Sequence, residues 1–290
     1  MAGLKEIRTR ISSVKSTRQI TSAMKMVAAA KLKKNQDKIT SLRPYANKLH
    51  DVLTAVRESM EEDFENVLMS SRKPQKVLII LVTSNRGLCG GFNANVIHKA
   101  LDVAEEIYPR QWKTGNLSFF AIGKKGADFI RSNKFLLAGV ETEVFDHLDF
   151  HSATQLANQF TEEFITGKYD RIDFIYNRFK NAVVQMITHE HFLPVHMEEK
   201  ETGPAVDYIF EPQKDLLLET LIPDVLKVQF YKVLLDSFAS EHGARMTAMH
   251  QATDNADDLI HELTLHYNKA RQASITKEIL DIVGGAEALR

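Results

Sequence analysis

The C-terminal part of this 290-residue sequence is almost free of helix-breaking residues. No proline follows Pro223, and Gly243 is the single glycine between it and Gly284. At ~1.5 Å per residue, one helix over residues 224–283, roughly 60 residues, would be about 90 Å long. An ordinary compact domain cannot hold a helix of that length, so the segment predicts a helix that extends beyond a single globular core.

The N-terminal segment has the same character. After Gly3 there is no glycine until Gly87 and no proline until Pro44, so residues 4–43 can form one helix. Two long helices at opposite ends of one chain most simply pair with each other. We therefore predict that the two end helices form an antiparallel coiled-coil shaft, and that the residues between them form a separate domain.

Both end segments carry a heptad pattern, which is typical of a coiled coil. The N-terminal seam begins with four apolar residues at 3-4-3 spacing, Leu4, Ile7, Ile11 and Val14. The seam then breaks, because the next heptad positions hold Arg18, Thr21 and Lys25. Apolar residues resume out of phase at Ile20, Met24, Val27 and Leu32. Two interpretations stay open: an imperfect helical hairpin, or a coil in which some seam residues face a third body around it.

The middle of the chain alternates between strand and helix patterns. Continuous apolar runs predict buried parallel strands at residues 76–82 and 117–122. Helical spacing covers residues 95–107, 124–132 and 152–166, and two adjacent strands, predicted to be antiparallel, follow at 171–178 and 183–188. This alternation predicts a doubly wound α/β domain with helices on both faces of its sheet.

These patterns predict four segments. The first is an N-terminal coiled-coil helix over residues 1–60, and the second is the central α/β domain over residues 74–200. Residues 201–223 are expected to form a proline-rich linker, and residues 224–290 a C-terminal coiled-coil helix. The fold class is therefore α/β plus a long antiparallel coiled coil.

Charge is distributed unevenly along the chain. The net charge is −1, but residues 1–43 carry 11 lysines and arginines against 2 acidic residues, so that the remaining residues sum to −10. The whole chain therefore has no bulk attraction to nucleic acid or to anionic lipid. The lone Cys89 excludes an intrachain disulfide and fits a reducing compartment, and no apolar run is long enough to insert into a membrane.

Tests for catalytic chemistry mostly fail. The loop Arg86-Gly-Leu-Cys-Gly-Gly91 follows a strand and precedes a helix, but it has neither the G-x-G-x-x-G nor the G-x-x-x-x-G-K-[ST] spacing of a phosphate-binding loop. No base lies near Cys89 in the sequence, and His189, His191 and His196 lack further zinc ligands at the usual spacing. We therefore expect no catalytic residue, no bound cofactor and no metal site.

Several segments resemble one family. Ile275-Thr-Lys-Glu278, Asp281 and Gly285-Ala-Glu-Ala288 resemble the C-terminal signature of the gamma subunit of F-type ATP synthases. The segment from Gln19 to Lys31 is similar to the N-terminal motif of that family. Three further blocks are similar as well, in the same order along the chain: Arg86–Gly91, Ser240–Met246 and Ala252–Asn255.

The resemblance implies a function that explains the missing active site. In the family, the paired end helices form a central rotor shaft inside a ring of alpha and beta subunits, and catalysis belongs to the beta subunits. The α/β domain lies near the epsilon subunit and the membrane rotor ring. The implied role is to couple rotation of that ring to the conformational cycle of beta, without nucleic acid as a partner.

The resemblance also implies which residues contact partners. Met24 and Lys25 would face an acidic segment of beta, and the loop with Arg86 and Cys89 would lie near beta. The implied contact or coupling residues of the C-terminal segment are Arg245, Arg271, Gln272, Thr276 and Glu278. Tyr208 and Glu211 would approach the rotor ring and epsilon. The lone cysteine rules out the regulatory cysteine pair of the chloroplast type, and the absence of a presequence before Met1 suggests a bacterial protein at the cytoplasmic face of the inner membrane.

Two alternatives come from other classes of protein. One is a nucleotide-dependent enzyme built on the α/β domain, which would show saturable binding of ATP or NAD in dialysis. The other is a basic coiled-coil protein that binds nucleic acid, whose affinity would fall steeply with salt. Neither alternative accounts for the C-terminal signature.

Overall fold

A computed structural model describes residues 2–58, 66–70, 72–146, 148–195, 211 and 213–287. Two very long helices, α1 (Ala2–Glu58) and α6 (Lys214–Glu287), enclose an α/β segment in the sequence. That segment contains, in order, β1 (Val77–Val82), α2 (Phe92–Glu106), α3 (Pro109–Thr114), β2 (Leu117–Ile122), α4 (Lys124–Ser132), β3 (Leu137–Glu141), the 3-10 helix η1 (Glu143–Phe145), α5 (Phe150–Ile165), β4 (Arg171–Phe179) and β5 (Gln185–Leu193). The predicted fold class is confirmed.

The strands form one five-stranded sheet in the order β3-β2-β1-β4-β5. β1 pairs in parallel with both β2 and β4, β2 pairs in parallel with β3, and β5 is antiparallel to β4. The predicted antiparallel pair is thus confirmed. Every residue of β1 and β2 is buried, as their continuous apolar sequences predict for strands covered on both faces.

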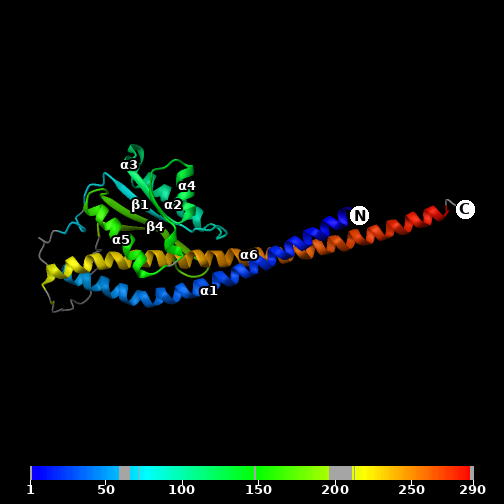
Figure 1. Ribbon diagram of the computed structural model, residues 1–290, viewed down its shortest axis with the longest axis horizontal. Coiled ribbons are helices and arrows are strands. Elements are labelled where there is room, and N and C mark those ends of the chain that lie inside the picture. Colours follow the sequence, from blue (N-terminus) through cyan, green and yellow to red (C-terminus); the bar gives the residue numbers. More distant parts are fainter. Residues whose placement is uncertain are drawn as a thin grey trace. The chain divides into compact units, whose positions relative to one another are not determined.

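Helices cover both faces of the sheet (Figure 1). On one face, Val96, Ala100 and Val103 of α2 share a core with Ile79 of β1 and Phe119 of β2. Trp112 of α3 and Phe129 of α4 pack against the same core. On the other face, Phe160 of α5 meets Phe120 at 4.9 Å between ring centroids, and Phe230 of α6 meets Phe174 of β4 at 5.2 Å. Aromatic contacts of Phe174 in β4 and Phe192 in β5 with Phe230 therefore hold this pair of strands against α6.

The chain divides into two compact units. One contains Met1–Ala28 and Arg245–Arg290, and the other contains Ala29–Ala244. Each of the two long helices thus contributes to both units, and the predicted central domain of residues 74–200 shares its unit with parts of α1 and α6. Close packing shows at Gly243, where an added Cβ would lie 3.0 Å from the carbonyl oxygen of Ala182 in the β4–β5 turn.

The predicted linker is wrong in part. α6 begins at Lys214, so residues 214–223 are helical, and Pro223 lies inside the helix instead of before it. Pro44 likewise lies inside α1. A proline removes one intrahelical hydrogen bond, and both helices continue because packing of their apolar faces outweighs that loss. β3 and α3 are elements that the sequence patterns did not predict.

Candidate partner-contact surface

Polar pairs join α1 and α6 within the unit formed by Met1–Ala28 and Arg245–Arg290. Arg18 Nε lies 2.5 Å from Asp257 Oδ1, the hydroxyls of Thr21 and Thr253 lie 2.8 Å apart, and Lys25 Nζ lies 3.3 Å from His250 Nδ1. Residue numbers rise along α1 as they fall along α6, so the two helices are antiparallel, as predicted. The polar heptad positions therefore form the seam.

The predicted break in the seam is wrong. Leu4, Ile7, Ile11 and Val14 are half-buried as expected, and the seam continues in phase through the buried Thr21 and the half-buried Lys25 to the buried Ala28. Of the supposed out-of-phase stripe, Ile20 and Val27 are 60% and 59% exposed and Met24 is half-buried, whereas Leu32 is buried, four residues after Ala28 and in phase with it. The expectation that seam positions are apolar failed because Arg18, Thr21 and Lys25 contact polar side chains of α6 at these positions.

Met24 lies beside this seam. It is half-buried, next to Lys25, whereas Met26 on the same turn is exposed. An exposed surface therefore combines apolar side chains with the lysines and arginines of α1. Scattered single apolar residues on a surface are normal, but an apolar group among cations on a long helix is typical of a surface that meets a partner.

The C-terminal part of α6 presents the other contact residues predicted from the sequence. Arg271, Gln272, Thr276 and Glu278 are all exposed. The Thr276 hydroxyl donates to the Gln272 carbonyl oxygen at 3.0 Å, and the Ser274 hydroxyl donates to Glu278 Oε1 at 3.4 Å. Their neighbours include large apolar side chains that are 47–71% exposed: Ile275, Ile279, Leu280, Ile282 and Val283.

The loop after β1 belongs to the other unit and is held by its own hydrogen bonds. The Ser84 hydroxyl donates to the Arg86 carbonyl oxygen at 2.7 Å, and Asn93 Nδ2 donates to Cys89 Sγ at 3.3 Å. Cys89 is buried, whereas Arg86 is exposed and Leu88 is 65% exposed in a left-handed conformation with φ of 63°. Cys89 thus shapes the loop, and Leu88, which sequence reasoning did not single out, joins Arg86 at its surface.

The remaining predicted contact residues are scattered. Arg245 is buried, with 8% of its surface exposed, and Glu211 is exposed. Tyr208 and His196 lie outside the described residues. The structure therefore brings Met24 and Lys25 together, and the α6 residues 271–278, but it does not gather all predicted contact residues at one place.

A buried polar cluster at the β4–β5 edge was missed by sequence reasoning. Asp173 is fully buried and accepts hydrogen bonds from His189 Nε2 and His191 Nδ1, both at 2.8 Å, and from the Tyr108 hydroxyl at 2.5 Å. Burial by itself raises the pKa of Asp173, but these hydrogen bonds outweigh it and hold the pKa well below its usual value. The register places His191 opposite Asp173 and His189 opposite Ile175, two residues further along β4, so that both imidazoles reach the same carboxylate. This His-x-His spacing was the available signal.

The same cluster has the residue types of a metal site. The ligand atoms of Asp173, His189 and His191 lie within 4.8 Å of one another, and two imidazoles with a carboxylate are a donor set that zinc accepts. However, Arg171 lies against it: its Nη2 is 2.6 Å from His191 Nδ1, and its Nε is 3.4 Å from Asp173 Oδ1. Because a guanidinium charge opposes a cation at this place, we interpret the cluster as a hydrogen-bond network that ties edge strand β5 to β4.

Comparisons with known proteins cover the whole chain. A family model described as ATP synthase matches residues 3–289. The ATP synthase gamma chain of Flavobacterium johnsoniae is 53% identical over 290 residues, which cover 100% of this chain and 99% of the relative. The gamma chain of Cytophaga hutchinsonii is 49% identical, again over 100% of this chain and 99% of the relative.

Solved structures share the fold. The central stalk and c-ring structure of the Tetrahymena thermophila mitochondrial ATP synthase contains a chain that matches with a TM-score of 0.59 and 25% identity, over 80% of this chain and 99% of that one. A chain of the Euglena gracilis mitochondrial ATP synthase matches with a TM-score of 0.72 and 20% identity, over 99% of this chain and 95% of that one. Taken with the full-length match to the gamma chains, the polar-seamed helix pair and the doubly wound domain show that this chain belongs to the ATP synthase gamma chain family.

Proposed function

We propose that this gamma chain transmits rotation of a membrane rotor ring to the catalytic beta subunits of an ATP synthase and is itself non-catalytic. The chain is a central-stalk subunit of an ATP synthase. The observation that carries the proposal is the exposed apolar end of α6, where Ile275, Ile279, Leu280, Ile282 and Val283 are 47–71% exposed. Side chains of this size gain free energy when a partner covers them. A ring of alpha and beta subunits around α6 is the partner that the family provides.

The two helices of the shaft explain how one chain acts differently on identical subunits. In the unit that contains Met1–Ala28, α1 and α6 are antiparallel and differ in sequence, so their pair has no threefold symmetry. Three identical beta subunits around such a pair therefore meet three different surfaces. The difference in contact free energy holds each beta subunit in a different conformation, and rotation passes that bias around the ring.

The basic surface of α1 is the second element of the proposal. Lys25 contacts His250 within the unit, and Met24 lies beside it half-buried. We expect these residues to face an acidic segment of beta. Charge attraction is long-ranged and needs no fixed register, which suits a surface that moves past its partner.

Roles follow for the other contact residues. Arg271 and Gln272, with Thr276 and Glu278 on the next turns, are expected to hydrogen-bond a loop of beta. The loop with Arg86 and Cys89 is expected to lie near beta, and Arg245 to support coupling. Glu211, with Tyr208 outside the described residues, is expected on the side of epsilon and the rotor ring.

The same proposal gives the location of the chain. None of the described helices is both long and apolar enough to cross a membrane. We expect a peripheral subunit at the cytoplasmic face of a bacterial inner membrane, bound through epsilon and the rotor ring.

A cross-linking experiment tests the proposal. In the assembled complex, Ile279→Cys should react with a photoactivatable thiol reagent, whereas the native Cys89 is buried and should react slowly. Illumination should attach the chain to alpha or beta and stop ATP hydrolysis, because a fixed shaft cannot pass its bias to the next subunit. Ser132→Cys at the end of α4 is the matched control, and its labelling should leave turnover intact. Undiminished turnover in complexes cross-linked through position 279 would exclude the rotary role.

A further inference from the structure

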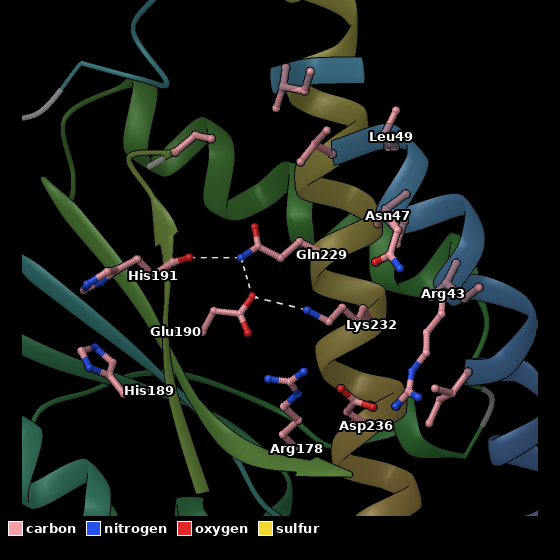
Figure 2. Close-up of a pocket in the computed structure, with 17 residues that line it drawn as sticks. Arg43, Asn47, Leu49, Arg178, His189, Glu190, His191, Gln229, Lys232 and Asp236 are labelled. Atoms are coloured by element: carbon pink, nitrogen blue, oxygen red, sulfur yellow. Dashed lines mark hydrogen bonds and ion pairs between the residues drawn. The ribbon is translucent and has the colours of Figure 1, made fainter. Parts of the chain in front are cut away.

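A cavity lies within the unit Ala29–Ala244, between α1, the β4–β5 pair and α6. Its volume is about 600 Å³, and its lining combines apolar residues of the two helices with a group of charged residues. Figure 2 shows the charged ones: Arg43 from α1, Arg178 from β4, Glu190 from β5, and Lys232 and Asp236 from α6. Cavities of about 300–1,000 Å³ are the size that binds small molecules.

Asp236 is the unusual residue of this cavity. Only 3% of its surface is exposed, and its Oδ1 has no hydrogen-bond partner among the described residues. Burial raises its pKa to about 6, although the charges of Lys232, Arg43 and Arg178 all act to lower it. All three cations are therefore near enough to act on the carboxylate. A buried acceptor without a donor is costly and suggests that a donor binds there.

Two arginines beside Asp236 also lack partners. Arg43 and Arg178 are exposed, and within the described part of the chain neither side chain has a hydrogen bond or ion pair. In Figure 2 their guanidinium groups lie on either side of the Asp236 carboxylate without bonding it. The site therefore offers one buried acceptor flanked by two sets of free donors.

Glu190 does not share this condition, because its own neighbours satisfy it. The Tyr176 hydroxyl donates to Glu190 Oε2 at 2.6 Å, Gln229 Nε2 donates to Oε1 at 2.8 Å, and Lys232 Nζ lies 3.9 Å from Oε1. The charges of Glu190 and Lys232 cancel each other. The two arginines and Asp236 then leave one excess positive charge among the residues that line the cavity. That balance favours an anion which can also donate a hydrogen bond.

We propose that this cavity binds inorganic phosphate, with Arg43 and Arg178 donating to its oxygens and its remaining O–H donating to Asp236. Hydrogen phosphate keeps an O–H at neutral pH, whereas sulfate has none and would set an oxygen against the carboxylate. A phosphate monoester dianion also lacks a P–O–H, because its second pKa is about 6. The site therefore distinguishes anions by whether they carry an O–H that can donate to Asp236. It is built from side chains and is independent of the glycine-rich loop, in which no phosphate-binding motif was found.

Calorimetric titration of the full-length chain tests the site. At pH 8, inorganic phosphate should bind saturably to the wild type, and sulfate and methyl phosphate should each bind on the order of tenfold more weakly or worse, since each lacks a hydrogen bond to the charged group. Equal binding of methyl phosphate would show that the phosphate O–H makes no contact with Asp236. Absence of saturable phosphate binding would overturn the proposal outright.

Two variants and a control assign the residues. Arg178→Gln should weaken phosphate on the order of tenfold or more, whereas Arg131→Gln, an exposed arginine on α4 outside the cavity, should not change it. In Asp236→Asn the amide can donate to either anion, so the preference for phosphate over sulfate should disappear. Circular dichroism checks that each variant is folded. The assignment would be refuted if a folded Asp236→Asn protein still preferred phosphate over sulfate. It would also be refuted if Arg178→Gln and Arg131→Gln weakened phosphate binding equally.

Discussion

Arg18, Thr21 and Lys25 show how single polar side chains specify the helix pair. Each meets a polar residue of α6, at distances of 2.5 to 3.3 Å. Exposed ion pairs such as Arg18–Asp257 add little stability, commonly ~0–1 kcal/mol. What they add is register, because an antiparallel pair shifted by one turn would separate all three contacts. A seam that is weak but specific suits a shaft that other subunits surround.

Met24→Lys is the first prediction at the scale of one residue. A thioether can move past a partner without forming a fixed bond. A lysine there would add a cation beside Lys25, and an extra ion pair with the acidic segment that we propose on beta, worth up to ~1 kcal/mol when exposed, would have to break at each step. Proton pumping driven by ATP should therefore fall more than ATP hydrolysis does.

The measurement for Met24→Lys is both rates in the same inverted membrane vesicles, at equal content of assembled complex. Ser22→Lys, on the same turn, adds the same charge without removing the thioether and serves as the matched control. If Met24→Lys lowers pumping and hydrolysis in equal proportion, the residue has no part in coupling.

Asp236→Asn is the second prediction at this scale, and it concerns stability. The pKa of Asp236 rises from 3.8 to about 6 on folding, so the folded state is penalised as pH rises from about 3.8 to about 6 and remains penalised above that. Replacing the carboxylate should raise the free energy of unfolding above pH 7 by up to roughly 2–3 kcal/mol.

The gain from Asp236→Asn should shrink as pH falls through 6 and vanish near pH 4, where the wild-type carboxyl is protonated in both states. Urea unfolding of both proteins between pH 4 and 8, without phosphate, measures this difference. Asp146→Asn, elsewhere in the chain, removes one carboxylate in the same way and is the control. A difference that is independent of pH would mean that Asp236 does not titrate in this range.

At the scale of elements, the C-terminal part of α6 combines exposed donors with exposed apolar side chains. Arg271→Ala with Gln272→Ala should weaken coupling while both helices stay folded, because both side chains are exposed and the seam is untouched. A lost arginine contact in a dehydrated interface costs about 2–5 kcal/mol. We therefore expect lower multisite ATP hydrolysis and lower ATP-driven proton pumping.

The control for this pair is Arg131→Ala with Gln155→Ala, two exposed residues on α4 and α5. Both double variants should assemble equally well, as judged by copurification with alpha and beta. Rates equal to the wild type in the Arg271 and Gln272 variant would show that these residues are passive.

Sequence patterns correctly located the elements whose local residues are enough to specify a strand or a helix. The continuous apolar runs located β1 and β2, and helical spacing located α4 over the observed residues. β3 (Leu137–Glu141) escaped because it is short, contains Gly139 and pairs only with β2. The start of α6 was misplaced because tertiary packing carries the helix through Pro223, against local propensity.

At the scale of the whole molecule, the family could be predicted because it is marked by contiguous motifs. The clusters around Asp173 and Asp236 could not, since topology brings their members together from distant segments. Tyr108 lies between α2 and α3, Asp173 in β4 and His189 in β5, whereas Arg43, Arg178 and Asp236 come from α1, β4 and α6. The His-x-His spacing groups His189 with His191, but a single sequence gives no reason to join them to Asp173 and Tyr108, or Asp236 to the two arginines.

The last prediction concerns the chain as a molecule on its own: the purified chain should not hydrolyse ATP. The loop after β1 has the position of a phosphate-binding turn, but Ser84 and Asn93 bond to each other and to the loop backbone, and the apolar Leu88 is exposed at its tip. Cys89 is buried and bonded to Asn93, so it is not poised as a nucleophile. The proposed phosphate cavity offers donors and one carboxylate, and these can hold an anion without activating water.

The measurement is phosphate release from ATP at each stage of purification, compared with the activity of the assembled complex. Any residual activity should separate from this chain on a sizing column, because the proposed function assigns the reaction to beta and only unequal contacts to this chain. Arg86→Ala serves as a check on the loop: if traces of activity came from a site there, this variant would remove them. The rotor function would be contradicted if ATP hydrolysis copurified with this chain through every column and reached the rate of the assembled complex. The chain would then carry a catalytic site of its own.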